Sequence, residues 1–369
     1  MRRAFAFLFL IACGPDPAPA PIEPTPPPTR SAAQDRALRH MAIDVAEAQL
    51  CGLLLDRFVP LPEDRPERPR DRLPLVEGRL WLSECHAERR GDALALHLAG
   101  RGWQRVERSA AGPLGSSFSV RGVVRLEATL DLEAELDLGY DERTHRASVT
   151  LTPRTTPRAR VTPIGTVPVS ADGGWSSVVG GIGGLLGTSP EARARPMLEA
   201  QAAITVEREL ARGATLQLDL CTGQLHATLG ALGDGEAVPA PPYADDEVRF
   251  RDNLRVRLRD GAFDLSGPFD GPIHVDLEVE SGEGVNAAIL CGPEAALTAS
   301  AFLSSGETPY PAHPERSRSV RRGAPATLTL PEGCPRAHLY VSAVDRRTPT
   351  TFRYRVRDDA EVEPLVRCR

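Results

Sequence analysis

The strongest constraint on the fold is a run of alternating residues between positions 118 and 140. Apolar side chains occupy almost every even position from Phe118 to Tyr140, while Arg, Glu, Thr and Asp fill most odd positions. Alternation with a period of two indicates β-structure that has one apolar face and one wet face, as in an antiparallel sheet. A straight strand of this length would span roughly 70 Å, so we expect it to bend strongly or to contain a turn.

Two helices are predicted on either side of this run. Ser31 and Gln34 form a capping-box pattern, which predicts a helix from there to about residue 56. Ser189 followed by Pro190 predicts a second helix start, although Pro196 either kinks this helix or marks its true start. Gly213 predicts a helix end near residue 212. We therefore predict an α+β N-terminal domain, in which two helices accompany a long-stranded antiparallel sheet. Its other strands are expected at residues 78–84, 92–104, 147–152, 215–220 and 224–229.

The last third of the chain predicts a different class of structure. Short alternating runs lie between Gly and Pro turns at the spacing that is typical of a β-sandwich. We therefore predict an all-β sandwich domain after the α+β domain. The expected organisation is a signal peptide at 1–12, a lipidated cysteine and tether at 13–30, the α+β domain at 31–232, a linker at 233–244 and the sandwich at 245–369.

The N-terminus has the layout of a secretory signal. Arg2 and Arg3 precede a short apolar run, Ala4 to Ala12, that is too short to span a bilayer. Leu10-Ile11-Ala12-Cys13 resembles the lipobox of bacterial lipoproteins, and this resemblance implies that Cys13 carries a diacylglyceryl group and an acyl chain such as palmitate, which together anchor firmly. Gly14 in place of aspartate, by resemblance to Gram-negative lipoproteins, implies the outer membrane, on its periplasmic or cell-surface side.

The residues after Cys13 form a proline-rich stretch from Gly14 to Thr29. Such a stretch favours extended polyproline II structure and would hold the folded part ~40–50 Å from the lipid. The formal net charge is -6, which argues against a nucleic-acid partner because such proteins need a concentrated basic surface.

The other cysteines are even in number, which in an exported chain predicts disulfide bonds. Six cysteines allow fifteen connectivities, and the pairs Cys51–Cys85 and Cys291–Cys334 are the ones we favour. Cys221 with Cys368 would then join the two predicted domains.

The order helix, antiparallel strands, helix, strand over residues 31–232 resembles the TULIP superfamily of tubular lipid-binding domains. That resemblance implies a curved sheet that wraps a long helix and leaves an apolar groove. The alternative is an α+β domain whose sheet face is filled by its two helices.

A glycine-rich apolar segment precedes the second predicted helix. Gly180 to Gly187 lacks the Lys-Ser/Thr pair and the strand–helix context of a phosphate loop. Two interpretations stay open. The segment is either a flexible lip at a hydrophobic groove or a membrane-touching loop, or it is a hydrophobic loop packed on the core. The candidate ligand-binding residues are Trp175, Val178, Val179, Ile182, Leu185 and Leu186.

No catalytic constellation is evident. The eight histidines are scattered, and neither HExxH nor GxSxG occurs. Asp131, Glu133, Glu135 and Asp137 share one strand face, which we interpret as solvated. We expect no catalytic residue, no metal site and no cofactor.

The functional expectation is a non-enzymatic envelope lipoprotein that is held on the membrane by its lipid anchor and binds an apolar or lipid ligand in the α+β domain. The alternative is a structural or adaptor lipoprotein that binds other envelope proteins through its β-sandwich and has no ligand cavity.

Overall fold

The computed structural model divides the chain into two units, Met1–Ala37 and Leu38–Arg369. Of the first unit only the start of one helix is described, so the account below concerns the second. Among the described residues, no helix is long and apolar enough to span a membrane. The described residues are 32–62, 75–111, 117–141, 145–172, 190–220, 225–229, 250–269, 273–308, 316–330, 333–334 and 336–358.

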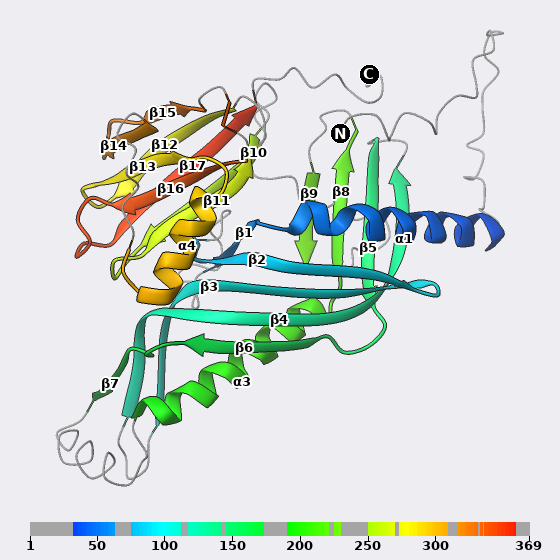
Figure 1. Cartoon of the computed structure of the whole chain (residues 1–369), viewed down its shortest axis with the longest axis horizontal. Coiled ribbons are helices and arrows are strands. Elements are labelled where there is room, and N and C mark those ends of the chain that lie inside the picture. Colours follow the sequence, from blue (N-terminus) through cyan, green and yellow to red (C-terminus); the bar gives the residue numbers. More distant parts are fainter. Residues whose placement is uncertain are drawn as a thin grey trace, which may run out of the picture. The chain divides into compact units, whose positions relative to one another are not determined.

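Strands dominate the described part of the chain, and three helices accompany them (Figure 1). The helices are α1 (Ala32–Leu54), α3 (Pro190–Leu210) and α4 (Glu294–Ser305). The strands of the first two thirds are β1 (Phe58–Pro62), β2 (Leu75–Arg90), β3 (Ala93–Ala111), β4 (Ser117–Asp141), β5 (Arg146–Pro153), β6 (Arg158–Ile164), β7 (Val169–Asp172), β8 (Ala214–Asp219) and β9 (Leu225–Leu229). Those of the last third are β10 (Phe250–Leu258), β11 (Phe263–Phe269), β12 (Ile273–Ser281), β13 (Gly284–Leu290), β14 (Ser317–Arg321), β15 (Ala326–Thr329), β16 (Ala337–Ala343) and β17 (Thr350–Asp358).

One mixed sheet of 13 strands runs through both the early and the late parts of the chain. Its order is β15-β12-β17-β10-β2-β3-β4-β5-β8-β9, with β1 beside β2 and with β6 and β7 beside β4. All of its pairs are antiparallel except β10 with β2, which is parallel. A second sheet, β11-β16-β13-β14, packs on its late strands.

The predicted fold class, an α+β domain with two helices followed by an all-β sandwich, is therefore wrong. Helices α1 and α3 are present, but the sheet they pack on does not end with their part of the chain, because β2 pairs with β10. The last third also contains a helix, α4, so it is not all-β. Periodicity identifies strands but not their partners. An open strand edge can pair with any other strand, so two regions of the chain that differ in composition can share one sheet. The domain boundaries themselves stay a prediction.

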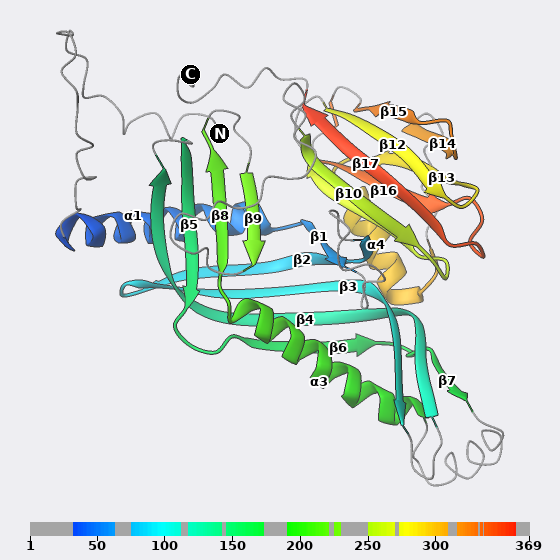
Figure 2. The same cartoon turned by 180° about the vertical axis from the view of Figure 1, so that it is seen from behind.

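The alternating run forms a single strand, β4, without an internal turn. It pairs with β3 along most of its length and bends with it (Figures 1 and 2). The close approach of β3 to β2 at Gly102 requires glycine, because a Cβ there would lie 2.1 Å from the carbonyl oxygen of Arg79. No side chain fits that approach, so the sequence must keep glycine there.

A β-bulge in β2 changes which side chains face each side of the sheet. The pairing of β2 with β3 shifts between Leu82 and Glu84, so one extra residue lies in β2. Before the bulge Trp81 faces the side on which the late strands pack. After it Cys85 and Ala87 face the opposite side, where α1 lies. The bulge lets one long strand contribute to two different cores.

Candidate functional site: the helix face of the large sheet

Alternate residues of β4 and their cross-strand partners form a continuous apolar face. We call it the helix face, because α1 and α3 both pack on it. Opposite the even-numbered residues of β4 lie Leu94, Leu96 and Leu98 in β3 and Val149 and Leu151 in β5. Directly opposite residues of paired strands point to the same side, so the apolar surface continues from strand to strand.

Helix α1 covers one end of this face. Ile43 is fully buried, and it packs with Leu94 and Leu136 of the sheet. The disulfide Cys51–Cys85 ties the C-terminal part of the helix to β2. This disulfide and Cys291–Cys334 confirm the prediction of disulfide bonds, in the pairs that we favoured.

Polar contacts fix the middle of α1 to the end of β2. The Arg89 guanidinium donates to Asp44 Oδ1 at 2.5 Å and also contacts His40, and the Arg89 backbone N–H donates to Glu47 Oε1 at 3.1 Å. Arg39 adds an ion pair to Asp137, Nε to Oδ1 at 3.0 Å. These partners are largely exposed, so they orient the helix more than they stabilise it.

Helix α3 covers the other end of the helix face. Ala194 is fully buried against Val120, Val124 and Val167. Two side chains of α3 bind the backbone of β6: Arg195 donates to the carbonyl of Pro163 at 2.6 Å, and Glu207 accepts from the backbone N–H of Ala159 at 3.0 Å. The helix thereby lies along β6 and satisfies part of its open edge.

Between the two helices the apolar side chains are only partly buried. This contrasts with the core of the late strands, where Val275, Leu339, Phe352 and Val356 are fully buried. The helix face is therefore apolar but incompletely covered, which is the property that a groove for an apolar ligand requires. The partly buried apolar residues between the helices are Leu126, Leu130 and Leu132 of β4. Leu138, Val149 and Leu151 are also partly buried but pack beside α1, and Leu216 and Leu218 of β8 continue the apolar surface beyond β5.

The opposite face of β2 and β3 is closed by the late strands. Trp103 stacks on Phe263 with ring centroids 4.6 Å apart, and Phe302 of α4 packs edge-on against both rings. The Trp103 indole N–H donates to the carbonyl of Phe263 at 3.2 Å. This face is a filled core and leaves no room for a ligand among these residues.

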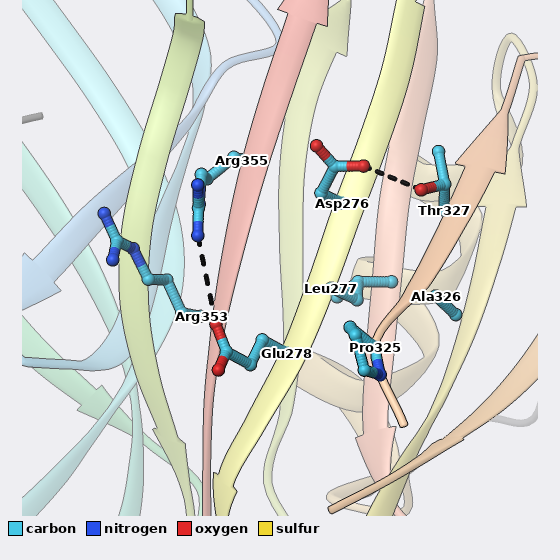
Figure 3. A pocket seen from close by; sticks show the side chains of 8 residues that line it. All are labelled: Asp276, Leu277, Glu278, Pro325, Ala326, Thr327, Arg353 and Arg355. Carbon is cyan, nitrogen blue, oxygen red and sulfur yellow. Dashed lines mark hydrogen bonds and ion pairs between the residues drawn. The ribbon is translucent and has the colours of Figure 1, made fainter. Parts of the chain in front are cut away.

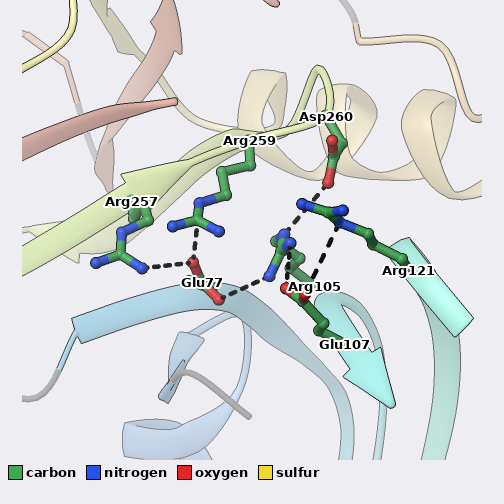
Figure 4. A network of polar contacts seen from close by, with 7 residues as sticks. All are labelled: Glu77, Arg105, Glu107, Arg121, Arg257, Arg259 and Asp260. Atoms are coloured by element: carbon green, nitrogen blue, oxygen red, sulfur yellow. Dashed lines mark hydrogen bonds and ion pairs between the residues drawn. The ribbon is translucent and has the colours of Figure 1, made fainter. Parts of the chain in front are cut away.

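Beside this aromatic core lies a network of ion pairs centred on the buried side chains of Glu77 and Arg105 (Figure 4). Glu77, with a side chain 4% exposed, is ion-paired with Arg105 at 3.8 Å, Arg257 at 3.6 Å and Arg259 at 3.7 Å. Burial alone would lower the pKa of Arg105, but the hydrogen bond to Glu107 and the nearby carboxylates raise it. The Glu107 carboxyl, held by Arg105, has a lowered pKa. Arg105 and Glu107 therefore stay charged. The ion pairs of Glu77 join β2 and β3 to β10, a contact that the sequence did not predict.

The carboxylates on the wet face of β4 show no paired arrangement for chemistry. Asp131 bonds to His97 Nδ1 at 2.7 Å, and Glu135 accepts from Arg154 Nε at 2.9 Å. Among the described residues no group of three or more His, Cys, Asp or Glu side chains could hold a metal ion.

Several predicted site residues lie outside the described part of the chain. These are the signal peptide, the lipidation site Cys13 and the tether, the six candidate ligand-binding residues between Trp175 and Leu186, and the cysteines Cys221 and Cys368. Their predicted roles stay predictions.

Comparison with known proteins does not assign a family. No family model matches the chain, and no curated protein sequence matches it. Similar solved structures include a multidomain part of extended synaptotagmin 2 that contains its SMP domain, at 8% identity over 89% of this chain and 68% of that chain, with a TM-score of 0.20. AerE from Microcystis aeruginosa is also 8% identical, over 82% of this chain and 99% of that chain, with a TM-score of 0.16. TM-scores this low carry no argument about function. Fold and site define a disulfide-containing, β-rich protein with an incompletely covered apolar sheet face.

Proposed function

We propose that this protein is a non-enzymatic lipid-binding protein that holds an acyl chain along the helix face. The observation that carries the proposal is the row of partly buried leucines between α1 and α3, of which Leu126, Leu130 and Leu132 lie on β4 itself. The weak likeness to a lipid-binding SMP domain is compatible with it but adds no weight.

The geometry of a strand suits an extended hydrocarbon chain. Side chains on one face recur about every 6.6 Å along a strand, and neighbouring strands are about 4.8 Å apart, so the leucines form parallel apolar rows. Each methylene that leaves water for such a surface contributes about 0.8 kcal/mol. An acyl chain is therefore favoured over a compact apolar ligand, which would contact only part of a row.

The expected anchor and lip complete the proposal. Lipidation of Cys13 would hold the protein at the membrane that supplies the ligand, with the proline-rich stretch as spacer. The apolar residues from Trp175 to Leu186 are attached to the end of β7 at one side and to the start of α3 at the other, and both elements pack near Val120 of β4. We propose that these residues close the groove over the bound chain.

The test is to purify the chain without its first 13 residues and to identify co-purifying lipid by native mass spectrometry. Delipidated protein is then titrated with a fluorescent fatty acid. We expect bound lipid in the first measurement and saturable binding in the second. Protein that carries no lipid and binds no fatty acid would refute the acyl-chain proposal and favour the adaptor alternative.

Two variants three positions apart on β4 locate the site. Leu130→Gln places an amide on the helix face, and it should weaken fatty-acid binding about tenfold, because it removes apolar contact and adds a polar group. Glu127→Gln places the same amide on the opposite, exposed face and should leave binding unchanged. Equal effects of the two variants would exclude the helix face.

The anchor has its own test. Cys13→Ala should abolish acylation and release the protein from the membrane fraction, and both are measured by mass and by fractionation. Unchanged mass and fractionation would overturn the anchor without touching the binding proposal.

A further inference from the structure

A hollow of ≈ 290 Å³ lies on the outer face of the late strands, away from the helix face. Figure 3 shows Arg353 and Arg355 of β17 on one side of it and Pro325 with Thr327 on the other. The acidic residues Asp276 and Glu278 of β12 lie between them. The hollow therefore combines guanidinium groups, carboxylates and an apolar wall within one small surface depression.

The strand register places charges of the same sign next to one another. Arg353 lies directly opposite Arg255 of β10 on one side and opposite Glu278 of β12 on the other. Like charges at directly opposite positions destabilise a sheet. Arg255 is ion-paired with Glu280, Nε to Oε2 at 2.6 Å, whereas Arg353 and Arg355 line the hollow. Their planar guanidinium groups suit an anion that has several oxygens.

The two carboxylates of the hollow differ in what they already bind. Asp276 is held by Arg357, Nε to Oδ2 at 2.7 Å and Nη2 to Oδ1 at 2.9 Å, and it accepts from Thr327 Oγ1 at 2.7 Å. Partial burial alone would raise the pKa of Asp276, but these hydrogen bonds lower it. Both of its oxygens are thus engaged, and its charge is compensated locally.

Glu278 is far more accessible. Its side chain is 59% exposed, and its ion pair with Arg355 Nη2 is 3.9 Å long, which is longer than a hydrogen bond. A carboxylate in this position can accept from an incoming ammonium group while a neighbouring guanidinium binds an anion.

We propose that the hollow binds a compact zwitterion of the phosphoethanolamine type, with the phosphate on Arg353 and Arg355 and the ammonium on Glu278. Arg353 and Glu278 are directly opposite, so their Cβ atoms are about 5 Å apart, and the two-carbon link of the ligand bridges a short gap of this kind. The ring of Pro325 supplies an apolar surface for the link. The site uses no residue of the helix face and does not depend on the acyl-chain proposal.

The ligand chemistry has two sources, a free phosphoethanolamine and a phosphatidylethanolamine headgroup. The full chain is titrated calorimetrically with phosphoethanolamine, with methyl phosphate and with ethanolamine, and is then assayed by flotation with vesicles of phosphatidylcholine with or without phosphatidylethanolamine. We expect phosphoethanolamine to bind at least about tenfold more tightly than either half-molecule, because each half lacks one charge-assisted contact. Preferential flotation with phosphatidylethanolamine assigns the headgroup as the source, and binding of the free compound alone assigns the soluble one.

Variants separate the two halves of the site. Arg353→Gln should weaken phosphoethanolamine binding about tenfold or more, and Glu278→Gln should remove the preference over methyl phosphate. Arg318→Gln, an exposed arginine of β14 in the second sheet, serves as the matched control and should change neither. Thermal melting of each variant checks that it folds.

Three results would overturn the proposal. The first is no binding of phosphoethanolamine at millimolar concentration, and the second is equal affinity for phosphoethanolamine and methyl phosphate. The third is an equal loss of phosphoethanolamine affinity in Arg353→Gln and in the control Arg318→Gln. None of these measurements involves fatty-acid binding, so failure here leaves the acyl-chain proposal standing.

Discussion

Arg79 of β2 and Asp264 of β11 form a two-point ion pair although 185 positions separate them in the sequence. Arg79 Nε lies 2.6 Å from Asp264 Oδ1, and Nη2 lies 2.9 Å from Oδ2. The side chains are only 1% and 2% exposed. The same guanidinium also donates to the Tyr354 hydroxyl at 3.2 Å and to the Phe58 carbonyl at 3.3 Å. These contacts give the buried Arg79 guanidinium a counter-charge and hydrogen-bond acceptors, and they join the early part of the chain to the late part.

Removing one partner of this pair should be costly. Asp264→Asn leaves the Arg79 charge buried without its counter-charge, so we expect a loss of about 3–5 kcal/mol in the free energy of unfolding. Urea denaturation measures it. The matched control is Arg336→Met, which breaks the half-exposed Arg336–Asp56 pair at 3.2 Å and should cost less than about 1 kcal/mol. Equal losses in the two variants would contradict the assigned role of burial.

A buried histidine predicts a pH dependence of stability. Burial lowers the pKa of His338 from 6.5 to about 4, and its ring packs edge-on against Phe58 at 5.5 Å. The folded state therefore disfavours the proton that the unfolded chain binds below pH 6.5. The contribution of His338 to the free energy of unfolding is complete above pH 6.5. It is lost progressively as the pH falls to about 4, by about 3 kcal/mol in total.

The measurement is the free energy of unfolding at pH 7 and pH 4.5 in the wild type and in His338→Gln. Other groups also titrate in this window, so the difference between the two proteins isolates the histidine. We expect the wild type to lose more stability on acidification than the variant. A variant that loses as much as the wild type would show that His338 does not titrate in this way.

The disulfide Cys51–Cys85 should stabilise the helix face in particular. It closes a separation of 34 residues, so the chain-entropy estimate of its contribution is about 3–4 kcal/mol. In the variant Cys51→Ala with Cys85→Ala, amide hydrogen exchange should accelerate in α1 more than in β12 or β16. The variant that lacks Cys291 and Cys334 is the control, and it should show the reverse pattern. Uniform acceleration in both would indicate global unfolding instead of local loosening.

Local patterns in the sequence predicted much of the secondary structure. The alternation from Phe118 to Tyr140 corresponds to β4, and the capping signals near Ser31 and Ser189 correspond to the starts of α1 and α3. These features depend on neighbours within a few residues, which is the range over which periodicity and capping act.

What the sequence did not predict are contacts between distant residues. The parallel pairing of β2 with β10 depends on which edges meet in space, and no local signal encodes it. The bulge near Glu84 reverses the facing of β2, so a single alternation pattern could not assign Arg79 to a buried contact and Cys85 to the helix face. The apolar face of the candidate site was predictable because it is the inner half of the same alternation. Its incomplete covering between two helices was not, because it depends on where α1 and α3 lie.

Glycine substitutions test the close approach of β2 and β3 at Gly102. Gly102→Ala would place a Cβ 2.1 Å from the carbonyl oxygen of Arg79, which belongs to the backbone of β2 and cannot rotate away. The strands must separate locally, and we expect a loss of at least about 2 kcal/mol, beyond the ordinary range of overpacking at flexible sites. The control is Gly52→Ala in α1, where nothing lies within 4 Å of the added Cβ and where the helix should gain about 0.5–1 kcal/mol. Thermal and urea unfolding of both variants give the comparison. A neutral Gly102→Ala would show that β2 and β3 relax without cost, and the requirement for glycine at this crossing would then be withdrawn.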